Sequence, residues 1–81
     1  MLSVKLYTKE GCWLCDMALD MLNGQREKYG IEIERIDIGN EGELYDLYRF
    51  DVPVLEFADG TTLNSHIKKK ALIEAIERNS V

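Results

Sequence analysis

The chain has 81 residues, a formal net charge of −5 and two cysteines. This length fits one domain, which we assign to residues 1–81, and two cysteines are too few for the disulfide framework of a small secreted protein. Phosphate binding needs a basic face, and the chain offers only a short lysine run at residues 68–70. No apolar stretch approaches the roughly 20 residues of a membrane span, and the start lacks the pattern of a signal peptide. We expect a cytoplasmic monomer with neither a nucleic-acid nor a membrane partner.

Apolar periodicity predicts a strand, a helix and a second strand in the first half of the chain. Residues 4–8 alternate as a short strand, and Gly11 ends that pattern. Apolar residues then recur at steps of three and four, which predicts a helix as far as Gly30. Its expected inward stripe is Leu14, Met17, Ala18, Met21 and Leu22. Residues 31–38 are rich in isoleucine, and because the isoleucines change face we expect this strand to be buried on both sides.

The second half of the chain reads as a short helix, a hairpin and a final helix. Residues 41–48 predict a helix that carries Leu44, Leu47 and Tyr48. Pro53 opens a strand at 54–57, and a turn signal leads into a second strand at 61–63. Asn64 or Ser65 is expected to cap the last helix, residues 66–78. The inward residues of that helix are expected to be Ile67, Ala71, Leu72, Ala75 and Ile76.

These elements predict an α/β fold. A right-handed βαβ unit makes the first two strands parallel, and the hairpin adds antiparallel neighbours. The expected result is a four-stranded mixed sheet with helices on both faces.

Both cysteines lie in Cys12-Trp13-Leu14-Cys15, where the first strand gives way to the first helix. Two thiols on a first helical turn can close a disulfide with little movement of the backbone. Cys12 also lies at the positive end of the helix dipole, which favours a thiolate, whereas Asp16 four residues later is expected to raise the pKa of that thiol. We therefore predict redox chemistry at sulfur, with Cys12 as nucleophile and the more buried Cys15 as resolving thiol.

Two other interpretations of the cysteine pair remain open at this point. Free cysteines often pack as small hydrophobic residues, which is the ordinary interpretation of a random pair. A zinc site usually needs four ligands, and His66 is the one further candidate, far away in the sequence. The position of the pair at a strand-to-helix turn favours the redox interpretation.

Residues 6–15 and the stretch Asp51-Val52-Pro53-Val54 resemble the glutaredoxin-like family of the thioredoxin fold, in its C-x-L-C-D/E group. The likeness spans nearly the whole chain and implies a sheet in the order 2-1-3-4 flanked by three helices. It also implies a cis bond before Pro53, opposite the active-site turn, with the backbone N–H and C=O of Val52 free to pair with an extended substrate. Lys9 lies where family members carry a lysine that binds glutathione or stabilises the thiolate.

Family members that bind glutathione well carry a Gly-Gly pair and an acidic residue at the start of the last helix. The corresponding stretch here runs from Leu63 to Lys69, without the glycines and with lysines in place of the acids. Glutathione is therefore a less favoured co-substrate than a protein disulfide or another small thiol. The proline that most family members carry between the two cysteines is also missing here.

Trp13 lies between the cysteines instead. It is expected either to form an exposed platform for a partner or to be buried against the domain's own surface.

The resemblance and the cysteine motif together predict a thiol–disulfide oxidoreductase that needs no organic cofactor. An unidentified reductant would restore its dithiol. Two alternatives come from other functional classes: a non-catalytic binding or redox-sensing module, and an iron–sulfur carrier in which two chains share a cluster through Cys12.

Overall fold

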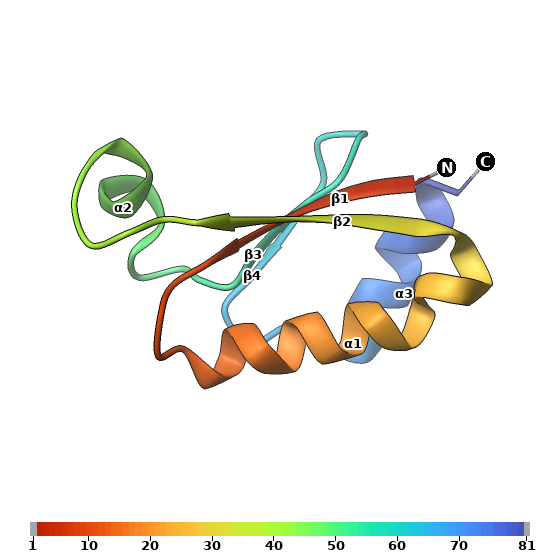
Figure 1. Ribbon diagram of the computed structural model, residues 1–81. Helices are drawn as coiled ribbons and strands as arrows, with labels where there is room; N and C mark the ends of the chain where they lie inside the picture. The colour runs from red at the N-terminus through yellow and green to blue at the C-terminus, as the bar shows by residue number, and fades with distance from the viewer. Residues whose placement is uncertain (1, 81) are drawn as a thin grey trace.

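The computed structural model describes residues 2–80, which form three helices and one sheet. In chain order the elements are β1 (Leu2–Thr8), α1 (Trp13–Tyr29), β2 (Ile31–Asp37), α2 (Glu43–Tyr48), β3 (Val54–Glu56), β4 (Thr62–Asn64) and α3 (Lys69–Arg78) (Figure 1). This succession is the one that the periodicity of the sequence predicts. Among residues 2–80, no helix combines the length and the apolar character needed to cross a membrane.

The strands form one mixed sheet in the order β2-β1-β3-β4. β1 and β2 are parallel, with Leu2 beside Ile31 and Thr8 beside Asp37, whereas β3 is antiparallel to both β1 and β4. Helices α1 and α3 cover one face, and α2 lies on the other side at one end of the strands (Figure 1). The predicted α/β class, thioredoxin fold and strand order are confirmed.

Alternation along β1 supplies both cores. Leu2, Val4 and Leu6 point to the face covered by α1 and α3, where they pack with Ala18, Leu22, Leu72, Ala75 and Ile76. Tyr7 points to the other face and packs with Ile38 and Val54 beneath the tyrosines of α2. The rings of Tyr7 and Tyr48 lie 4.7 Å apart between centroids. The sheet is therefore buried along its length on one face and only at one end on the other.

The expectation that the second strand is buried on both sides is wrong, because β2 is an edge strand. Ile31 and Ile33 pack on the face of α1 and α3, whereas Ile36 and Ile38 pack on the face of α2. The isoleucines change face along the strand because α1 and α3 cover one face at its start, whereas α2 covers the other face at its end. The residues between and beside the isoleucines are mostly exposed.

Two predicted helical stripes also need correction. In α1 the buried residues are Cys15, Ala18 and Leu22, while Met17 is 43% exposed. In α2 the inward residues are Tyr45 and Tyr48, and the leucines expected there, Leu44 and Leu47, are exposed instead. Both errors arise because each segment has more apolar residues than its buried face can hold.

The last helix begins later than predicted, and neither expected residue caps it. Its N-cap is Lys68, whose side chain makes no capping bond. Ser65 instead adopts a left-handed backbone, with φ of 58°, and its N–H donates to the carbonyls of both Asp51 and Pro53, at 3.0 Å each. Ser65 is therefore part of the loop that holds Pro53 in place.

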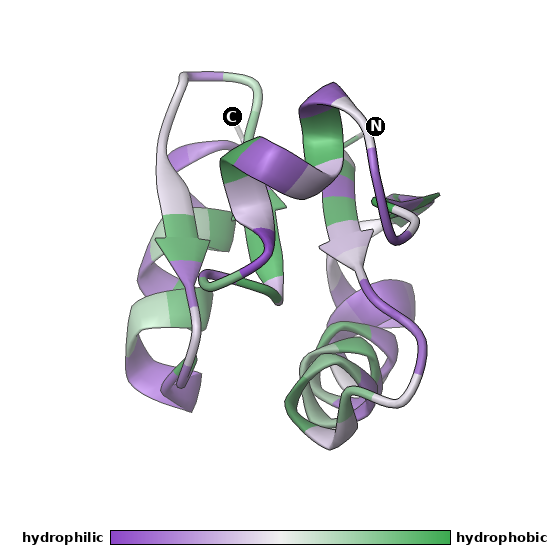
Figure 2. Ribbon diagram, turned by 90° about the vertical axis from the view of Figure 1, so that its left-hand side faces the viewer, coloured by the Kyte–Doolittle hydropathy of each residue, from purple (hydrophilic) through white to green (hydrophobic). Residues whose placement is uncertain are grey.

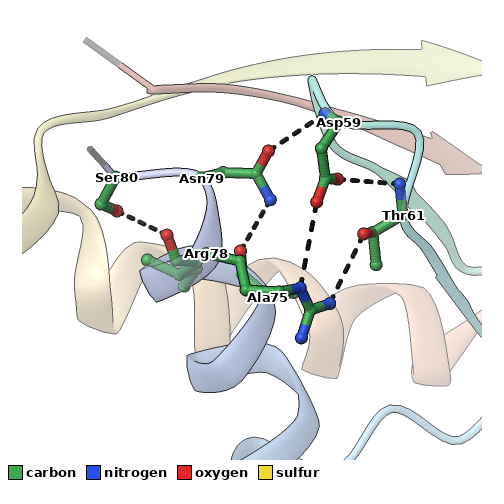
Figure 3. A network of polar contacts seen from close by, with 7 residues as sticks. Asp59, Thr61, Ala75, Arg78, Asn79 and Ser80 are labelled. Atoms are coloured by element: carbon green, nitrogen blue, oxygen red, sulfur yellow. Dashed lines mark hydrogen bonds and ion pairs between the residues drawn. The ribbon is translucent and has the colours of Figure 1, made fainter.

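Polar contacts join the tip of the β3–β4 hairpin to the end of α3 (Figure 3). The N–H of Asp59 donates to Asn79 Oδ1 at 3.1 Å, and Arg78 lies between Asp59 and Thr61. Hydrogen bonds from Thr61 hold the pKa of Asp59 below its usual value. These contacts lie at the end of the molecule away from Cys12.

Replacing Leu72 by alanine tests the larger core. Leu72 is fully buried, and its truncation is expected to lower the free energy of unfolding by about 2–5 kcal/mol through lost burial and a residual cavity. The control is Leu47→Ala, since this leucine is 59% exposed and its loss should change stability by about 0.5 kcal/mol or less. Urea denaturation of both variants gives the two values. Equal losses would contradict the assignment of Leu72 to the core.

Candidate active site

The loop after β1 places Cys12 at the carboxyl end of the strand. Gly11 has a φ of 76°, a left-handed value that favours glycine, and it turns the chain away from the sheet. The N–H of Cys12 then donates to the Lys9 carbonyl at 3.3 Å. Cys12 itself has an extended backbone and is the N-cap of α1. Its position is thus determined by the strand before it and the helix after it.

The side chain of Cys12 caps the helix. Its Sγ accepts a hydrogen bond from the backbone N–H of Cys15 at 3.1 Å. The first turn of a helix has unpaired N–H groups and the positive end of the dipole, both of which favour negative charge on the capping atom. Cys12 is half-buried, so it is the more accessible of the two cysteines.

Cys15 lies one turn further into the helix and is only 3% exposed. The pKa of its thiol is raised to about 12, chiefly by burial and then by the hydrogen bond to Cys12, with smaller increases from the charges of Cys12 and Asp16. A hydrogen bond to the Lys9 backbone acts in the opposite direction and lowers this pKa. Cys15 therefore keeps its proton near neutral pH. Both cysteines are free thiols, and the predicted contrast in their burial is confirmed.

Pro53 reaches the same end of the sheet from β3. Val54 pairs with Tyr7, so Pro53 lies beside the end of β1, from which the loop leads to Cys12. The Val52–Pro53 bond is cis, as the family resemblance implies. The register of the sheet thus brings the cis-proline loop and the cysteine pair together.

The Val52 backbone differs from expectation in one respect. Its N–H is not free, because it donates to the Tyr48 carbonyl at 3.1 Å in the turn that follows α2. The Val52 carbonyl accepts no hydrogen bond from residues 2–80. The carbonyl is therefore available as an acceptor but the N–H is not available as a donor, so the predicted two-bond pairing is wrong for this conformation.

Trp13 and Lys9 flank the cysteines in different ways. Trp13 is 66% exposed, so the alternative of burial against the domain's own surface is wrong. Lys9 is half-buried and lines an open pocket of about 590 Å³. The other lining residues are Glu10, Asp37, Gly39, Asn40 and Tyr45.

Sequence reasoning missed Ser65 and this pocket. Ser65 holds the proline loop by two backbone hydrogen bonds, and no side-chain pattern distinguishes that role from a helix cap. The pocket lies between the loops that follow the parallel strands β1 and β2, and the register of those strands was the signal that could have found it. Among residues 2–80, no three histidine, cysteine or acidic side chains come together to hold a metal ion.

Comparisons with known proteins agree with this fold. Residues 3–77 match the family model described as Glutaredoxin-like domain (DUF836). The chain is similar to the structural genomics target XcR50 from X. campestris, with 25% identity, a TM-score of 0.79, and coverage of 93% of this chain and 96% of that one. It is also similar to protein Ne2328 from Nitrosomonas europaea, with 29% identity, a TM-score of 0.73, and coverage of 91% and 88%.

The fold likeness extends to a more distant protein. Thioredoxin O2 from Arabidopsis thaliana, solved in its oxidized state, is 20% identical with a TM-score of 0.69. The match covers 100% of this chain and 76% of thioredoxin O2. At this identity the likeness concerns the fold.

Alkylation of the reduced protein tests the difference between the two thiols. At pH 7 a thiol with a pKa of about 12 is ionised about three thousandfold less than a free cysteine with a pKa of about 8.5. We expect iodoacetamide to modify Cys12 first and to reach Cys15 only slowly, with the Cys15 rate rising as the pH is raised. Peptide mapping by mass spectrometry measures both rates. The urea-unfolded chain is the control in which both cysteines should react alike, and similar rates in the folded protein would contradict the buried, protonated Cys15.

Proposed function

We propose that this chain, which belongs to the glutaredoxin-like domain family, is a thiol–disulfide oxidoreductase that reduces protein or low-molecular-weight disulfides. One observation carries the proposal. Cys12 Sγ caps α1 by accepting the Cys15 N–H, and the buried Cys15 thiol beside it has a raised pKa. This arrangement supplies an accessible nucleophilic sulfur, Cys12, and a protonated resolving sulfur, Cys15. Dithiol exchange needs both.

The first step uses Cys12. Its thiolate attacks one sulfur of the substrate disulfide, forms a mixed disulfide, and releases the other substrate sulfur as a thiolate that takes up a proton. The helix N-terminus favours negative charge on Cys12 before this attack. Because the pKa of Cys15 is raised, this second thiol stays protonated and does not compete for the substrate.

The second step uses Cys15. Two of the causes that raise its pKa, the hydrogen bond to Cys12 and the charge of Cys12, change once Cys12 is bonded to substrate. Cys15 then gives its proton to the departing substrate thiolate and attacks Cys12 Sγ. The products are a Cys12–Cys15 disulfide and a second substrate thiol, so two electrons pass from protein to substrate, with one proton from Cys15 and one from the solvent.

The partners we propose follow from the surroundings of the pair. The first turn of α3 has no acidic residue, which removes the usual partner of the glutathione ammonium group. A protein disulfide or another small thiol compound is therefore the preferred substrate, with Trp13, Lys9 and the Val52–Pro53 loop as its contacts. A separate reductant restores the dithiol, no organic cofactor takes part, and a reducing compartment such as the cytoplasm suits the chemistry.

Serine substitutions of the two cysteines test the function. With hydroxyethyl disulfide as substrate, Cys12→Ser should lower the rate by about a hundredfold or more, since it removes the nucleophile. Cys15→Ser should instead stop at a mixed disulfide, which intact-protein mass spectrometry detects as a mercaptoethanol adduct on Cys12. Lys70→Ala, an exposed change on α3, is the control.

Two results would contradict the proposal. One is a Cys12→Ser variant that retains the activity of the wild type. The other is a purified protein that is brown, with visible absorbance lost on Cys12→Ser, which would support the iron–sulfur carrier instead.

A further inference from the structure

Large exposed apolar side chains among residues 2–80 are confined to two segments. Trp13 and Met17 lie in the first turns of α1, and Leu44, Leu47 and Phe50 lie in or just after α2. Trp13 is 66% exposed and Phe50 is 82% exposed. We call these five residues the apolar rim. Exposed apolar surface gathered at one place on a small domain often marks an interaction site.

The sheet brings both segments of the apolar rim to one end of the molecule. β1 and β2 are parallel and end in register, with Thr8 beside Asp37. The chain leaving β1 leads to Cys12 and α1, and the chain leaving β2 leads to α2. Figure 2 looks at this end, with α2 in front and α1 seen along its axis below it. Phe50 follows α2 and comes three residues before the cis-proline, whereas Trp13 directly follows Cys12, so each part of the apolar rim adjoins one segment of the cysteine site in the chain.

A pocket with two acidic lining residues lies between the segments that lead from the sheet to the two parts of the apolar rim. It is the pocket of about 590 Å³ between the β1–α1 loop and the β2–α2 segment. Glu10 and Asp37 contribute two carboxylates to its lining, against one ammonium from Lys9. Asp37 also accepts the Gly39 N–H at 2.7 Å, which holds its carboxylate in place. An elongated side chain that ends in a positive charge complements this lining.

The wider charge distribution agrees with a cationic partner. The first turn of α2 carries Glu43 and Asp46, and its last turn has no basic residue. The basic residue nearest in sequence, Arg49, has its guanidinium 4.6 Å from the centroid of the Phe50 ring and 5.7 Å from that of the Tyr45 ring, so it lies closest to the rim residue. Opposite charges across an interface raise association rates and fix orientation, with an effect that salt screens.

We propose that the substrate disulfide is carried by an apolar polypeptide segment with a lysine or arginine close to the cysteine. The apolar side chains of the segment contact the apolar rim on both sides of Cys12, and its basic side chain enters the pocket between Glu10 and Asp37. The proposal rests on the proposed function and names the substrate of the same site. The protein dithiol is oxidised to the Cys12–Cys15 disulfide while the peptide disulfide is reduced to two peptide thiols, so no other reactant is required.

Two synthetic peptide disulfides test this inference. Each is a symmetric disulfide of a short peptide with leucine and phenylalanine near its cysteine, and the two differ only in carrying lysine or glutamate at one position. Pre-reduced protein is mixed with each peptide, quenched with acid, and analysed by mass spectrometry for the Cys12–Cys15 disulfide. Every rate constant is divided by that for hydroxyethyl disulfide, which is small and uncharged.

The lysine peptide should react about tenfold faster or more than the glutamate peptide at low salt, and the ratio should fall at about 0.5 M salt. In the Glu10→Gln, Asp37→Asn double variant the ratio should approach one, whereas Glu74→Gln, which removes an exposed carboxylate from α3, should leave it unchanged. Phe50→Ser should slow both peptides about tenfold more than it slows hydroxyethyl disulfide, because it removes apolar contact area.

Equal rates for the two peptides would overturn the inference, as would a lysine preference that survives in the double variant. Either result with normal reduction of hydroxyethyl disulfide leaves the proposed function intact. Failure to oxidise the protein with all three disulfides would instead remove the proposed function.

Discussion

The hydrogen bond from the Cys15 N–H to Cys12 Sγ, 3.1 Å long, is the contact on which the site depends. A helix start leaves backbone donors without partners, and side-chain oxygens commonly accept from them. Here a sulfur takes that place. The geometry that satisfies the helix therefore also brings the two thiols together, and no separate element is needed to pair them. Because Cys12 is held by the turn at Gly11 on one side and by α1 on the other, the sulfur has a defined position before any substrate arrives.

Stability and chemistry lie in different parts of this small domain. The larger core is made mainly by β1, β3, α1 and α3 and is centred on fully buried residues such as Leu22, Leu55 and Leu72. The cysteine pair, the cis-proline loop and the apolar rim lie where β1 and β2 end and β3 begins. At the opposite end, Asp59 and Asn79 join the hairpin to the last helix (Figure 3). The exposed residues near the cysteines can therefore serve a partner without weakening the main core.

Apolar periodicity was sufficient to predict the order of the elements, and the family resemblance implied the strand order and the cis bond before Pro53. Burial at particular positions was less predictable. Met17 and Leu47 have the spacing of core residues, yet each helix has a buried face too narrow for all its apolar residues. The role of Ser65 depends on backbone hydrogen bonds across the β3–β4 hairpin, which no local pattern encodes. The Val52 N–H was expected to be free, but a turn after α2 occupies it, and that turn is decided by tertiary packing of Tyr48.

The position of β2 at the border of the sheet has a consequence for the behaviour of many copies in solution. A seven-residue border strand presents unpaired backbone groups along its outer side, and such groups can recruit another chain into a continuous sheet. In this strand the aliphatic residues alternate with Glu32, Glu34, Arg35 and Asp37, all exposed. Stacking two such strands would force these charges together and strip water from them. The same acidic character that disfavours phosphate ligands thus helps to keep neighbouring copies from aggregating through their borders.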